Sequence, residues 1–361
     1  YVLRLRSQGS PDKEITFVDA IKGEIKLPEN IHDIVLLKKD GIPTYHFAHA
    51  IDDHLMRTTT VVRGGEWLAS APIHYELFHL LGFKMPAYAH TAHLMKFDEE
   101  TGGKRKLSKR KDPELSLDYY RKDGYHPYTM KVYLLTLLNS NFEEWHEKFP
   151  DKDINEFPFS VEKMNQSGAL FDKDKLHNIC KNELSKLSEE ELYDFLYDWA
   201  KENEPENVEK WFGDREKMLQ ILRLYMGVGA KRRRKDLMYA KQIFELISYF
   251  FDGESAEEMD EFKLDEDMVS KILKSYLAKY DHNDDNSVWF NKLKEIADEH
   301  GFASDMKAYK ANPENFKGNV SDIAEAVRIA VTGRANTPDL WTIVHIMGEE
   351  QMTERIKKHI K

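Results

Sequence analysis

Cysteine is nearly absent from this chain of 361 residues, in which Cys180 stands alone. A single cysteine excludes an internal disulfide framework and a cysteine-based zinc site, and it is typical of proteins of the reducing cytoplasm, where we place this chain. No stretch of about 18 apolar residues is present, so no membrane-spanning helix is expected. The first residue is Tyr1, and no charged and then apolar leader follows it. The chain is therefore predicted to begin in the middle of a protein, without a signal peptide.

Positive charge is scarcer than negative charge, but it is unevenly spread. The formal net charge is −11, yet six of the eight residues 104–111 are basic (KRKLSKRK) and residues 231–235 form an unbroken KRRRK. Acidic residues are densest between positions 252 and 267. An acidic protein with local basic faces can still bind RNA. The charge alone therefore neither predicts nor excludes a nucleic-acid partner.

The spacing of apolar residues divides the chain into two parts. Short alternating runs predict strands at residues 2–6, 15–18, 24–27, 33–38 and 86–95. Helical spacing predicts helices at residues 43–56, 74–81, 116–124 and 130–138. From residue 189 onward the spacing is helical almost throughout. Strands that alternate with helices are typical of a parallel sheet, so we expect an α/β part followed by an all-α part.

One basic segment, Lys-Leu-Ser-Lys-Arg at residues 106–110 (the KLSKR loop), carries the clearest chemistry. A basic loop of this composition is usually a solvated surface turn. Here it follows a predicted strand and the flexible pair Gly102 and Gly103, and a helix is expected to start near Asp112 or Ser116. Lysines on a mobile loop suit the negative charge that develops when pyrophosphate leaves an α-phosphate. The N–H groups of a nearby helix start would add to this effect.

The KLSKR loop is also the form that glutamyl-tRNA synthetases commonly show of the class I "KMSKS" signature. Other blocks follow in the order of the same family. They are DGIPTYHFAHAIDDHLMRTTTVVRGGEWLASAPIHYELFHLLGF at 40–83, SLDYYRKDGYHP at 116–127, SGALFDKDKL at 167–176 and AVTGRANTPDLWTIVHIMG at 330–348. The chain therefore resembles a bacterial-type glutamyl-tRNA synthetase over most of its length, with weaker support between about 186 and 320.

The resemblance implies a domain order. Residues 1–44 would be the remainder of a connective, acceptor-binding domain, and residues 45–95 the second half of a class I Rossmann-like nucleotide-binding domain. Residues 96–185 would carry the KLSKR loop and a stem-contact domain. Residues 186–361 would form an all-α anticodon-binding region, with a division into two subdomains near residue 252.

The resemblance also indicates a missing piece. Class I synthetases carry a His-Ile-Gly-His type motif in the first half of the nucleotide fold, and no His-x-Gly-His occurs here. The segments 46–49 (HFAH) and 90–93 (HTAH) have the histidine spacing but lack the glycine that lets backbone approach ATP. The chain is thus expected to be a C-terminal portion that lacks the N-terminal half of the catalytic domain.

Several residues coincide with positions that the family uses. The resemblance implies an amino-acid pocket formed by Tyr45, His49 and Arg63. It implies catalytic roles for Lys106 and Lys109, which would stabilise charge on the phosphates. It implies ATP contacts from Glu66, Trp67, Leu94, Lys106, Leu107, Ser108, Lys109 and Arg110.

Alternatives stay open for some of these positions. Arg63 could instead form an ordinary surface ion pair, and His49, where many relatives have Asn, could merely pack. The triplet at 52–54 (Asp-Asp-His) is not expected to bind a metal, because neighbouring residues on a helix do not face one point. The KRRRK run at 231–235 is interpreted as a helix, either one that meets RNA phosphate or a solvated helical face.

The function implied is that of a glutamate–tRNA ligase. Glutamate would attack the α-phosphate of ATP, and the terminal ribose of tRNA would then take the glutamyl group. The expected partners are L-glutamate, ATP with Mg²⁺, tRNA(Glu) and, as an open alternative, tRNA(Gln), with no membrane partner. No structural metal is predicted, and the family is usually monomeric. This chain alone is expected to bind tRNA without aminoacylating it.

Three rival interpretations remain. Glutaminyl-tRNA synthetase shares the nucleotide fold, but its typical anticodon region is a β-barrel, whereas residues 186–361 have helical spacing. The short paralogue that glutamylates a modified tRNA base has no anticodon-binding region. The chain could also act only as a tRNA-binding module.

Overall fold

The computed structural model describes residues 1–98, 100–166, 168–251 and 259–361. The chain divides into two compact units, which we describe separately. Unit 1 comprises Tyr1–Tyr119 and Pro127–Leu176, and unit 2 comprises Tyr120–His126 and His177–Lys361. The predicted domain boundaries at 44 and 95 fall inside unit 1, and the predicted division near 252 lies outside the described residues. An α/β part followed by an all-α part is confirmed.

All strands found in the described residues belong to unit 1. Its strands and helices are short and end at turns expected from the sequence. Its strands are β1 (Leu3–Arg4), β2 (Glu14–Asp19), β3 (Gly23–Pro28), β4 (Val35–Leu37), β5 (Thr60–Gly64), β6 (Ala87–Thr91), β7 (Leu94–Phe97), β8 (Lys104–Lys106) and β9 (Ala169–Leu170). Its helices are α1 (Tyr45–Leu55), α2 (Ala71–Leu80), α4 (Pro127–Leu138) and α5 (Phe142–Lys148). The chain crosses between the units within α3 (Leu117–Asp123) and α6 (Lys173–Leu184).

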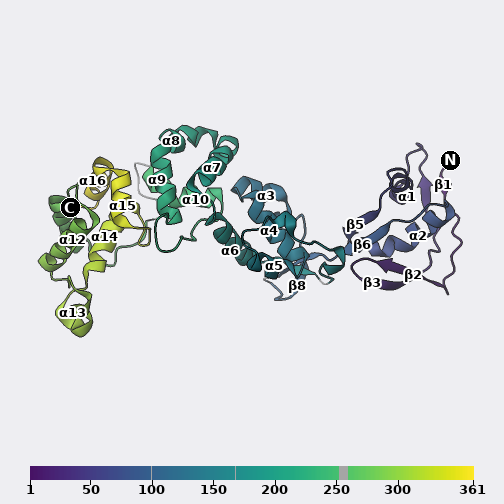
Figure 1. Ribbon diagram of the computed structural model, residues 1–361, viewed down its shortest axis with the longest axis horizontal. Helices are drawn as coiled ribbons and strands as arrows, with labels where there is room; N and C mark the ends of the chain where they lie inside the picture. The colour runs from purple at the N-terminus through teal and green to yellow at the C-terminus, as the bar shows by residue number, and fades with distance from the viewer. Residues whose placement is uncertain (99, 167, 252–258) are drawn as a thin grey trace. The chain divides into compact units, whose positions relative to one another are not determined.

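The main sheet of unit 1 is mixed rather than parallel, which corrects the prediction. Its strand order is β3-β2-β6-β5. The pairs β2–β6 and β5–β6 are parallel, whereas β2 and β3 are antiparallel. The difference arises because only a short turn joins β2 to β3, with Gly23 at a φ of 77°, and so short a connection permits only an antiparallel pair. Figure 1 shows this hairpin beneath α2.

The region predicted as one strand at 86–95 forms two strands in different sheets. β6 belongs to the main sheet, and β7 belongs to a small sheet of order β8-β7-β9. The chain therefore changes sheets between Thr91 and Leu94, next to the KLSKR loop that β8 leads into. A second boundary also differs from the prediction, because α2 begins at Ala71, with Pro72 in its first turn, rather than at His74.

Two helices of unit 1 pack against each other, and one of them, α2, packs against the main sheet. α1 and α2 contact each other, and their buried faces meet through Ala50, Leu77 and Phe78. Phe17 of β2, Tyr88 of β6 and Ala71 of α2 form a neighbouring buried cluster. These apolar contacts hold the start of α1 and the ends of β5 and β6 in one place, which is where the candidate site lies.

The regular secondary structure in the described residues of unit 2 is helical. Its helices beyond α6 are α7 (Glu189–Asn203), α8 (Val208–Phe212), α9 (Arg215–Met226), α10 (Ala240–Ile247), α11 (Glu266–Lys279), α12 (Asn286–His300), α13 (Met306–Ala311), α14 (Val320–Thr332), α15 (Leu340–Met347) and α16 (Glu349–Lys357). One continuous apolar core includes Leu222, Ile243, Leu273, Val327 and Ile343, all fully buried.

Helix ends in unit 2 follow ordinary capping chemistry. Ser188 and Glu191 form a reciprocal capping box at the start of α7, and Asn319 and Asp322 do the same for α14.

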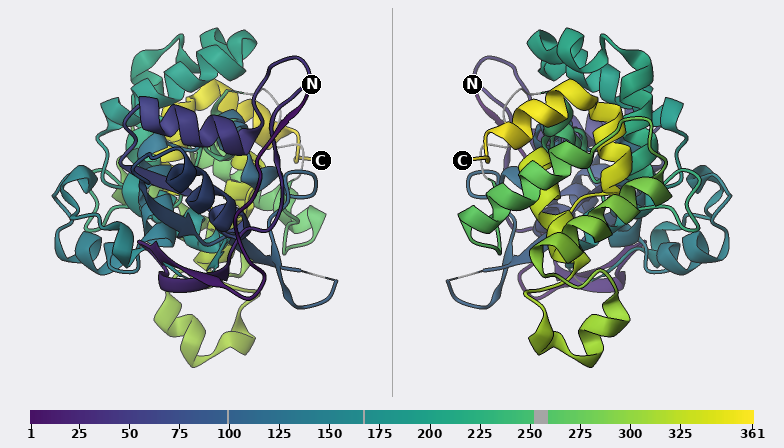
Figure 2. Two further views of the ribbon diagram at one scale, coloured as in Figure 1. Left: turned by 90° about the vertical axis from the view of Figure 1, so that its right-hand side faces the viewer. Right: turned by 90° about the vertical axis from the view of Figure 1, so that its left-hand side faces the viewer.

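Away from the apolar core of unit 2, α13 stands apart from the other helices of this unit (Figures 1 and 2).

The basic run at 231–235 is not a helix, which corrects both helical interpretations of it. It lies in a loop between α9 and α10, residues 227–239, which we call the basic loop. Gly227, at a φ of 66°, ends α9, since this left-handed conformation favours glycine, and Gly229 follows at a φ of 80°. The backbone N–H of Arg234 then bonds to the carbonyl of Met226 at 2.9 Å. Among the described residues, no helix is both long and apolar enough to cross a membrane.

Candidate functional site

The parallel pair β5–β6 places a cation at the carboxyl edge of the main sheet. Arg63 on β5 is in register with His90 on β6. Both residues lie near the carboxyl ends of parallel strands, the usual place for ligands in α/β sheets. Gly64 follows directly, and a Cβ there would lie 2.2 Å from a carboxylate oxygen of Glu66. The Arg-Gly-Gly-Glu sequence therefore allows the turn that brings Glu66 back toward the strand end.

The Arg63 guanidinium is held by neutral groups. Its Nε donates to Nε2 of His90 at 2.9 Å, and Nη1 lies 3.2 Å from Nδ1 of His74. Nη2 lies 3.4 Å from the carbonyl oxygen of Trp67. The guanidinium carbon lies 4.8 Å from the ring centroid of Tyr88. A guanidinium has five N–H groups, so these three hydrogen bonds leave two N–H groups for a ligand.

No carboxylate of the described residues neutralises this cation directly. Among the described residues, no ion pair of Arg63 is present, although its side chain is partly buried. Within the described part of the chain, the structure therefore gives no support to the alternative of an ordinary surface ion pair for Arg63. A partly buried guanidinium surrounded by neutral acceptors is poised to pair with an anion from outside the chain.

Two histidines beside Arg63, the buried His74 and the partly buried His46, are neutral for a physical reason. Burial, reinforced by the charges of His49 and Arg63, lowers the pKa of His74 to about 2. Burial and the charge of Arg63 likewise lower the pKa of His46. Nδ1 of His74 must accept from Arg63, so its Nε2 carries the proton and donates to Nδ1 of His46 at 2.9 Å. The orientation of both rings is thereby fixed.

His49 uses both of its ring nitrogens within the protein. Nδ1 lies 2.8 Å from Asp53, and Nε2 lies 2.7 Å from the hydroxyl of Tyr88. Burial lowers the pKa of His49 despite the opposing charge of Asp53. Tyr45 is about half exposed, at 48%, and its ring lies 4.5 Å from that of Trp67 by centroids. The structure therefore brings four of the predicted residues together on one side of the site. We call this side the wall, and it consists of Tyr45, His49, Arg63 and Trp67.

His54, the last residue of the triplet at 52–54, stacks on Phe83 at a ring-centroid distance of 3.7 Å. Asp53 is turned toward His49 instead. Asp53 and His54 thus contact different partners, as expected for neighbours on a helix.

A cleft of about 560 Å³ joins the strand end to the KLSKR loop in unit 1. Six of the predicted ATP-site residues line it, namely Glu66, Leu94, Lys106, Leu107, Ser108 and Lys109. His93 links its two sides, because its Nδ1 lies 3.5 Å from Glu66 and its Nε2 lies 3.5 Å from Nζ of Lys106. Arg110 and Trp67 are not among the lining residues of this cleft.

A buried carboxylate anchors the KLSKR loop. Asp112 is 2% exposed and takes a two-point ion pair from Arg105, and it also accepts from the backbone N–H of Ser108 at 2.7 Å. Lys96 adds a second cation at 3.2 Å. The hydrogen bonds from Arg105 hold the pKa of Asp112 well below its usual range, although burial opposes them. The loop backbone is therefore fixed while Lys109 stays exposed.

Sequence reasoning missed the residues behind the site. Asp19, His74 and His90 are each less than 2% exposed, but no local pattern connects them, since Asp19 and His90 are 71 residues apart. Arg105 was seen only as part of a basic run. One available signal was the block of histidines at 46, 49, 74 and 90, an unusual density for strands and helices that are otherwise apolar.

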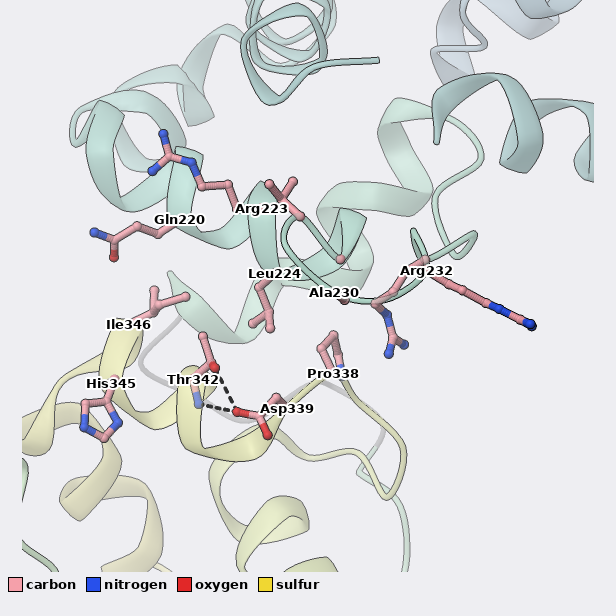
Figure 3. A pocket seen from close by; sticks show the side chains of 13 residues that line it. Gln220, Arg223, Leu224, Ala230, Arg232, Pro338, Asp339, Thr342, His345 and Ile346 are labelled. Carbon is pink, nitrogen blue, oxygen red and sulfur yellow. Dashed lines mark hydrogen bonds between the residues drawn. The ribbon is translucent and has the colours of Figure 1, made fainter. Parts of the chain in front are cut away.

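A second cleft, of about 730 Å³, lies in unit 2 beside the basic loop (Figure 3). Arg223 of α9 lines it but is paired with Glu189 at 3.0 Å. Asp339 on the opposite wall accepts two hydrogen bonds from Thr342, at 2.9 and 2.8 Å. Arg232 lines the cleft without an ion pair among the described residues. The basic loop thus brings an uncompensated cation to this cleft.

Comparison with known proteins gives both units a family. Residues 1–178 match the family model described as tRNA synthetases class I (E and Q), catalytic domain. Residues 191–360 match the model described as anticodon binding domain.

Relatives match along the whole chain. The glutamate–tRNA ligase of Acetivibrio thermocellus is 53% identical over 360 residues, which is 99% of this chain and 65% of that protein. The glutamate–tRNA ligase of Alkaliphilus metalliredigens is 31% identical, over 100% of this chain and 68% of its own length. A crystal structure of a glutamate tRNA ligase from Elizabethkingia meningosepticum in complex with its amino acid matches with a TM-score of 0.71 at 25% identity, covering 99% of this chain and 68% of that one. This chain spans about 65% of the length of the first of these relatives. It belongs to the glutamate–tRNA ligase family of class I tRNA synthetases.

Proposed function

We propose that the protein to which this chain belongs is a glutamate–tRNA ligase. The observation that carries this proposal is the charge of Arg63, which is held by neutral acceptors and has no carboxylate partner among the described residues. A carboxylate of glutamate completes this pair, whereas the neutral amide of glutamine does not. The exposed ring of Tyr45 covers one side of the same wall. His49, whose ring nitrogens contact Asp53 and Tyr88, supports the wall and reaches glutamate only if one of those contacts opens.

The cleft beside the KLSKR loop would take ATP. Glu66 at its rim is suited to accept the ribose hydroxyls, and Leu94 and Leu107 supply apolar surface for the base. Trp67 and Arg110 are proposed as outer ATP contacts. Mg²⁺ would arrive on the phosphates as part of the substrate. The cleft contains both the proposed sugar contact and the proposed phosphate contacts, which supports a single nucleotide site.

Catalysis in this proposal is positioning and electrostatics. A carboxylate oxygen of glutamate attacks the α-phosphorus, the bond to the β-phosphate oxygen breaks, and pyrophosphate leaves. Lys106 and Lys109 stabilise the charge that develops on the phosphates. A ribose hydroxyl of the terminal adenosine then attacks the glutamyl carbonyl carbon, loses its proton, and AMP leaves. No side chain acts as a covalent nucleophile.

The helical unit 2 would contact tRNA(Glu), and tRNA(Gln) remains the second candidate. The helical character of unit 2 favours this family over glutaminyl-tRNA synthetase, and its length favours it over the short paralogue. We further propose that the 361 residues alone bind tRNA but do not aminoacylate it, because a His-x-Gly-His motif is not among them.

The test is aminoacylation by the full-length protein. Purified tRNA(Glu), tRNA(Gln) and an unrelated tRNA are each offered with ATP and either glutamate, glutamine or aspartate. The proposal expects glutamate to be attached to tRNA(Glu), and attachment of glutamate to tRNA(Gln) decides the second candidate. Attachment of glutamine in preference to glutamate, or of no amino acid, would refute the proposal.

A further inference from the structure

Arg63 is one end of a chain of side-chain contacts that continues through His90 to Asp19. Nδ1 of His90 lies 2.6 Å from Oδ2 of Asp19. The backbone N–H of His90 donates to the same oxygen at 3.0 Å. Both side chains are fully buried. Asp19, His90 and Arg63 therefore form a linear series from β2 through β6 to β5, the three strands that lie side by side in the main sheet.

The series has one consistent placement of protons. An ionised carboxylate only accepts hydrogen bonds, so Nδ1 of His90 must carry the proton that faces Asp19. Nε2 of His90 is then a lone pair, and it is the atom that accepts from Nε of Arg63. The opposite tautomer would direct an N–H of His90 at an N–H of Arg63. Asp19 thus sets the tautomer of His90, and the tautomer decides whether His90 can hold Nε of Arg63.

Asp19 is itself held as a carboxylate. Its Oδ1 accepts from the backbone N–H groups of Ile21 and Lys22, at 3.0 and 2.9 Å. Burial would raise the pKa of Asp19, but the hydrogen bond from His90 and those from Lys22 and Ile21 outweigh it and lower the pKa. For His90, burial together with the charges of Arg63 and Lys22 lowers the pKa by more than Asp19 raises it. The pair is therefore an ionised carboxylate beside a neutral imidazole.

This arrangement keeps the positive charge of Arg63 available. A carboxylate placed directly against Arg63 would occupy its N–H fork and neutralise it. Here the neutral imidazole of His90 fixes the guanidinium instead. The His90 ring lies between Arg63 and the carboxylate of Asp19. On the other side His74 does the same at Nη1, and its proton is directed to His46.

We propose that Asp19 and His90 are positioning residues that aim Arg63 at the carboxylate of the substrate. This inference rests on the proposed function. It assigns no contact with substrate to Asp19 or His90, which act only through Arg63.

Substitutions of His90 test the proposal in the full-length protein. His90→Leu removes the acceptor for Arg63. His90→Gln can return an acceptor oxygen near the position of Nε2. We expect His90→Leu to raise the KM for glutamate about 10- to 100-fold, the scale of losing one hydrogen bond to a charged group, and to leave the KM for ATP within about twofold. His90→Gln should recover most of the loss. His79→Gln, an exposed histidine of α2 outside the site, is the matched control.

Asp19→Asn separates positioning from packing. It keeps the size of the side chain but removes the charge that selects the His90 tautomer, so the KM for glutamate should rise while kcat changes less. If Asp19→Asn fails to fold, because Asp19 also holds the turn at Ile21 and Lys22, the two His90 variants still decide the matter.

The pH profile gives an independent readout. The groups that face His90 are Asp19 of β2, Arg63 of β5, His74 of α2, Tyr88 of β6 and Lys22 of the turn after β2. Because the pKa of His90 is lowered, its acceptor stays neutral as the pH falls through about 6.5, the usual histidine value. The KM for glutamate in the unmodified protein should therefore stay flat through that range.

The outcomes are distinguishable. A folded His90→Leu protein whose KM for glutamate is unchanged overturns the positioning role and leaves the proposed function intact. Equal loss in the KM for glutamate and for ATP, with no recovery in His90→Gln, also overturns it, because that pattern indicates general damage. Failure of the unmodified full-length protein to attach glutamate refutes the proposed function itself.

Discussion

Arg105 and Asp112 face each other as a two-point ion pair, with Nη1–Oδ2 and Nη2–Oδ1 distances of 2.7 Å each. They flank the KLSKR loop on its two sides in the sequence. The same carboxylate accepts from the backbone N–H of Ser108 at 2.7 Å. A planar guanidinium matched to a carboxylate in this way restricts geometry more than a single contact does. The loop that carries Lys106 and Lys109 is therefore tied at its base.

Replacing Asp112 should destabilise this anchor. Asp112→Asn keeps the shape but loses the charge, and we expect the free energy of unfolding to fall by about 1–3 kcal/mol, the scale of hydrogen bonds to a charged group. Thermal unfolding at pH 7 measures this as a lower Tm. Asp12→Asn, an exposed aspartate, is the control and should leave Tm unchanged. An unaltered Tm in Asp112→Asn would contradict the anchoring role.

The same pair predicts how stability responds to acid. Arg105 lowers the pKa of Asp112 below its value in the unfolded chain, which is about 3.9. Stabilisation by the pair is therefore fully present above that unfolded value and is lost as the pH falls toward the folded pKa. The difference in Tm between the unmodified protein and Asp112→Asn should be constant from pH 8 to about 5 and should shrink below about 4. A difference that grows in acid would contradict the sign of the shift.

Lys109 is exposed and lines the cleft, which suits a group that meets charge only during the reaction. In the full-length protein Lys109→Ala should slow adenylate formation by about 2–4 kcal/mol of transition-state energy, or about 30- to 1000-fold. Pyrophosphate exchange, measured with tRNA present, gives the rate, and substrate binding should change far less. Lys111→Ala is the matched control outside the cleft. An exchange rate that Lys109→Ala leaves unchanged would remove the loop from the mechanism.

Much of the fold could be predicted because it depends on local patterns. The helix predicted at 116–124 is α3, and it ends at Gly124, whose φ of 80° suits glycine alone. The strands predicted at 15–18 and 24–27 are β2 and β3. In these places propensity, apolar spacing and turn residues agree, so the sequence contains the answer locally.

The errors have more than one origin. The basic run at 231–235 has good helix formers, but the nearby Gly227 ends α9 before it. The strand at 86–95 looks continuous, yet its second half pairs with β8 and β9 rather than with β5. Composition does not reveal which sheet a strand joins.

For the candidate site, the family resemblance supplied the residues that line the surface, and the structure adds what supports them. The predicted ATP residues gather mostly in one cleft, although their roles stay predictions. Asp19, His74 and His90 do not form a sequence motif, because their contacts depend on distances in the folded unit. The pairing of β2, β5 and β6 sets those distances for Asp19 and His90, and the packing of α2 sets them for His74.

The basic loop of unit 2 predicts how tRNA binding depends on salt. Arg232 lines the cleft without an ion pair among the described residues, whereas Arg234 is paired with Asp236 at 2.6 Å. If Arg232 meets a phosphate, Arg232→Gln should weaken binding of tRNA by the 361-residue chain and reduce the slope of log affinity against log salt by about one. Arg234→Gln, the matched control, should change the slope less. Equal slopes in Arg232→Gln and the unmodified chain would contradict a phosphate contact.

The account depends most on the pairing of Arg63 with a carboxylate of glutamate. The direct measurement is the KM for glutamate of full-length Arg63→Gln, with Arg57→Gln, an exposed arginine of the turn after α1, as its control. Losing a charge-assisted pair should raise the KM for glutamate by about 10- to 100-fold and leave the KM for ATP nearly unchanged, while Arg57→Gln changes neither. A folded Arg63→Gln protein with an unchanged KM for glutamate would contradict the account.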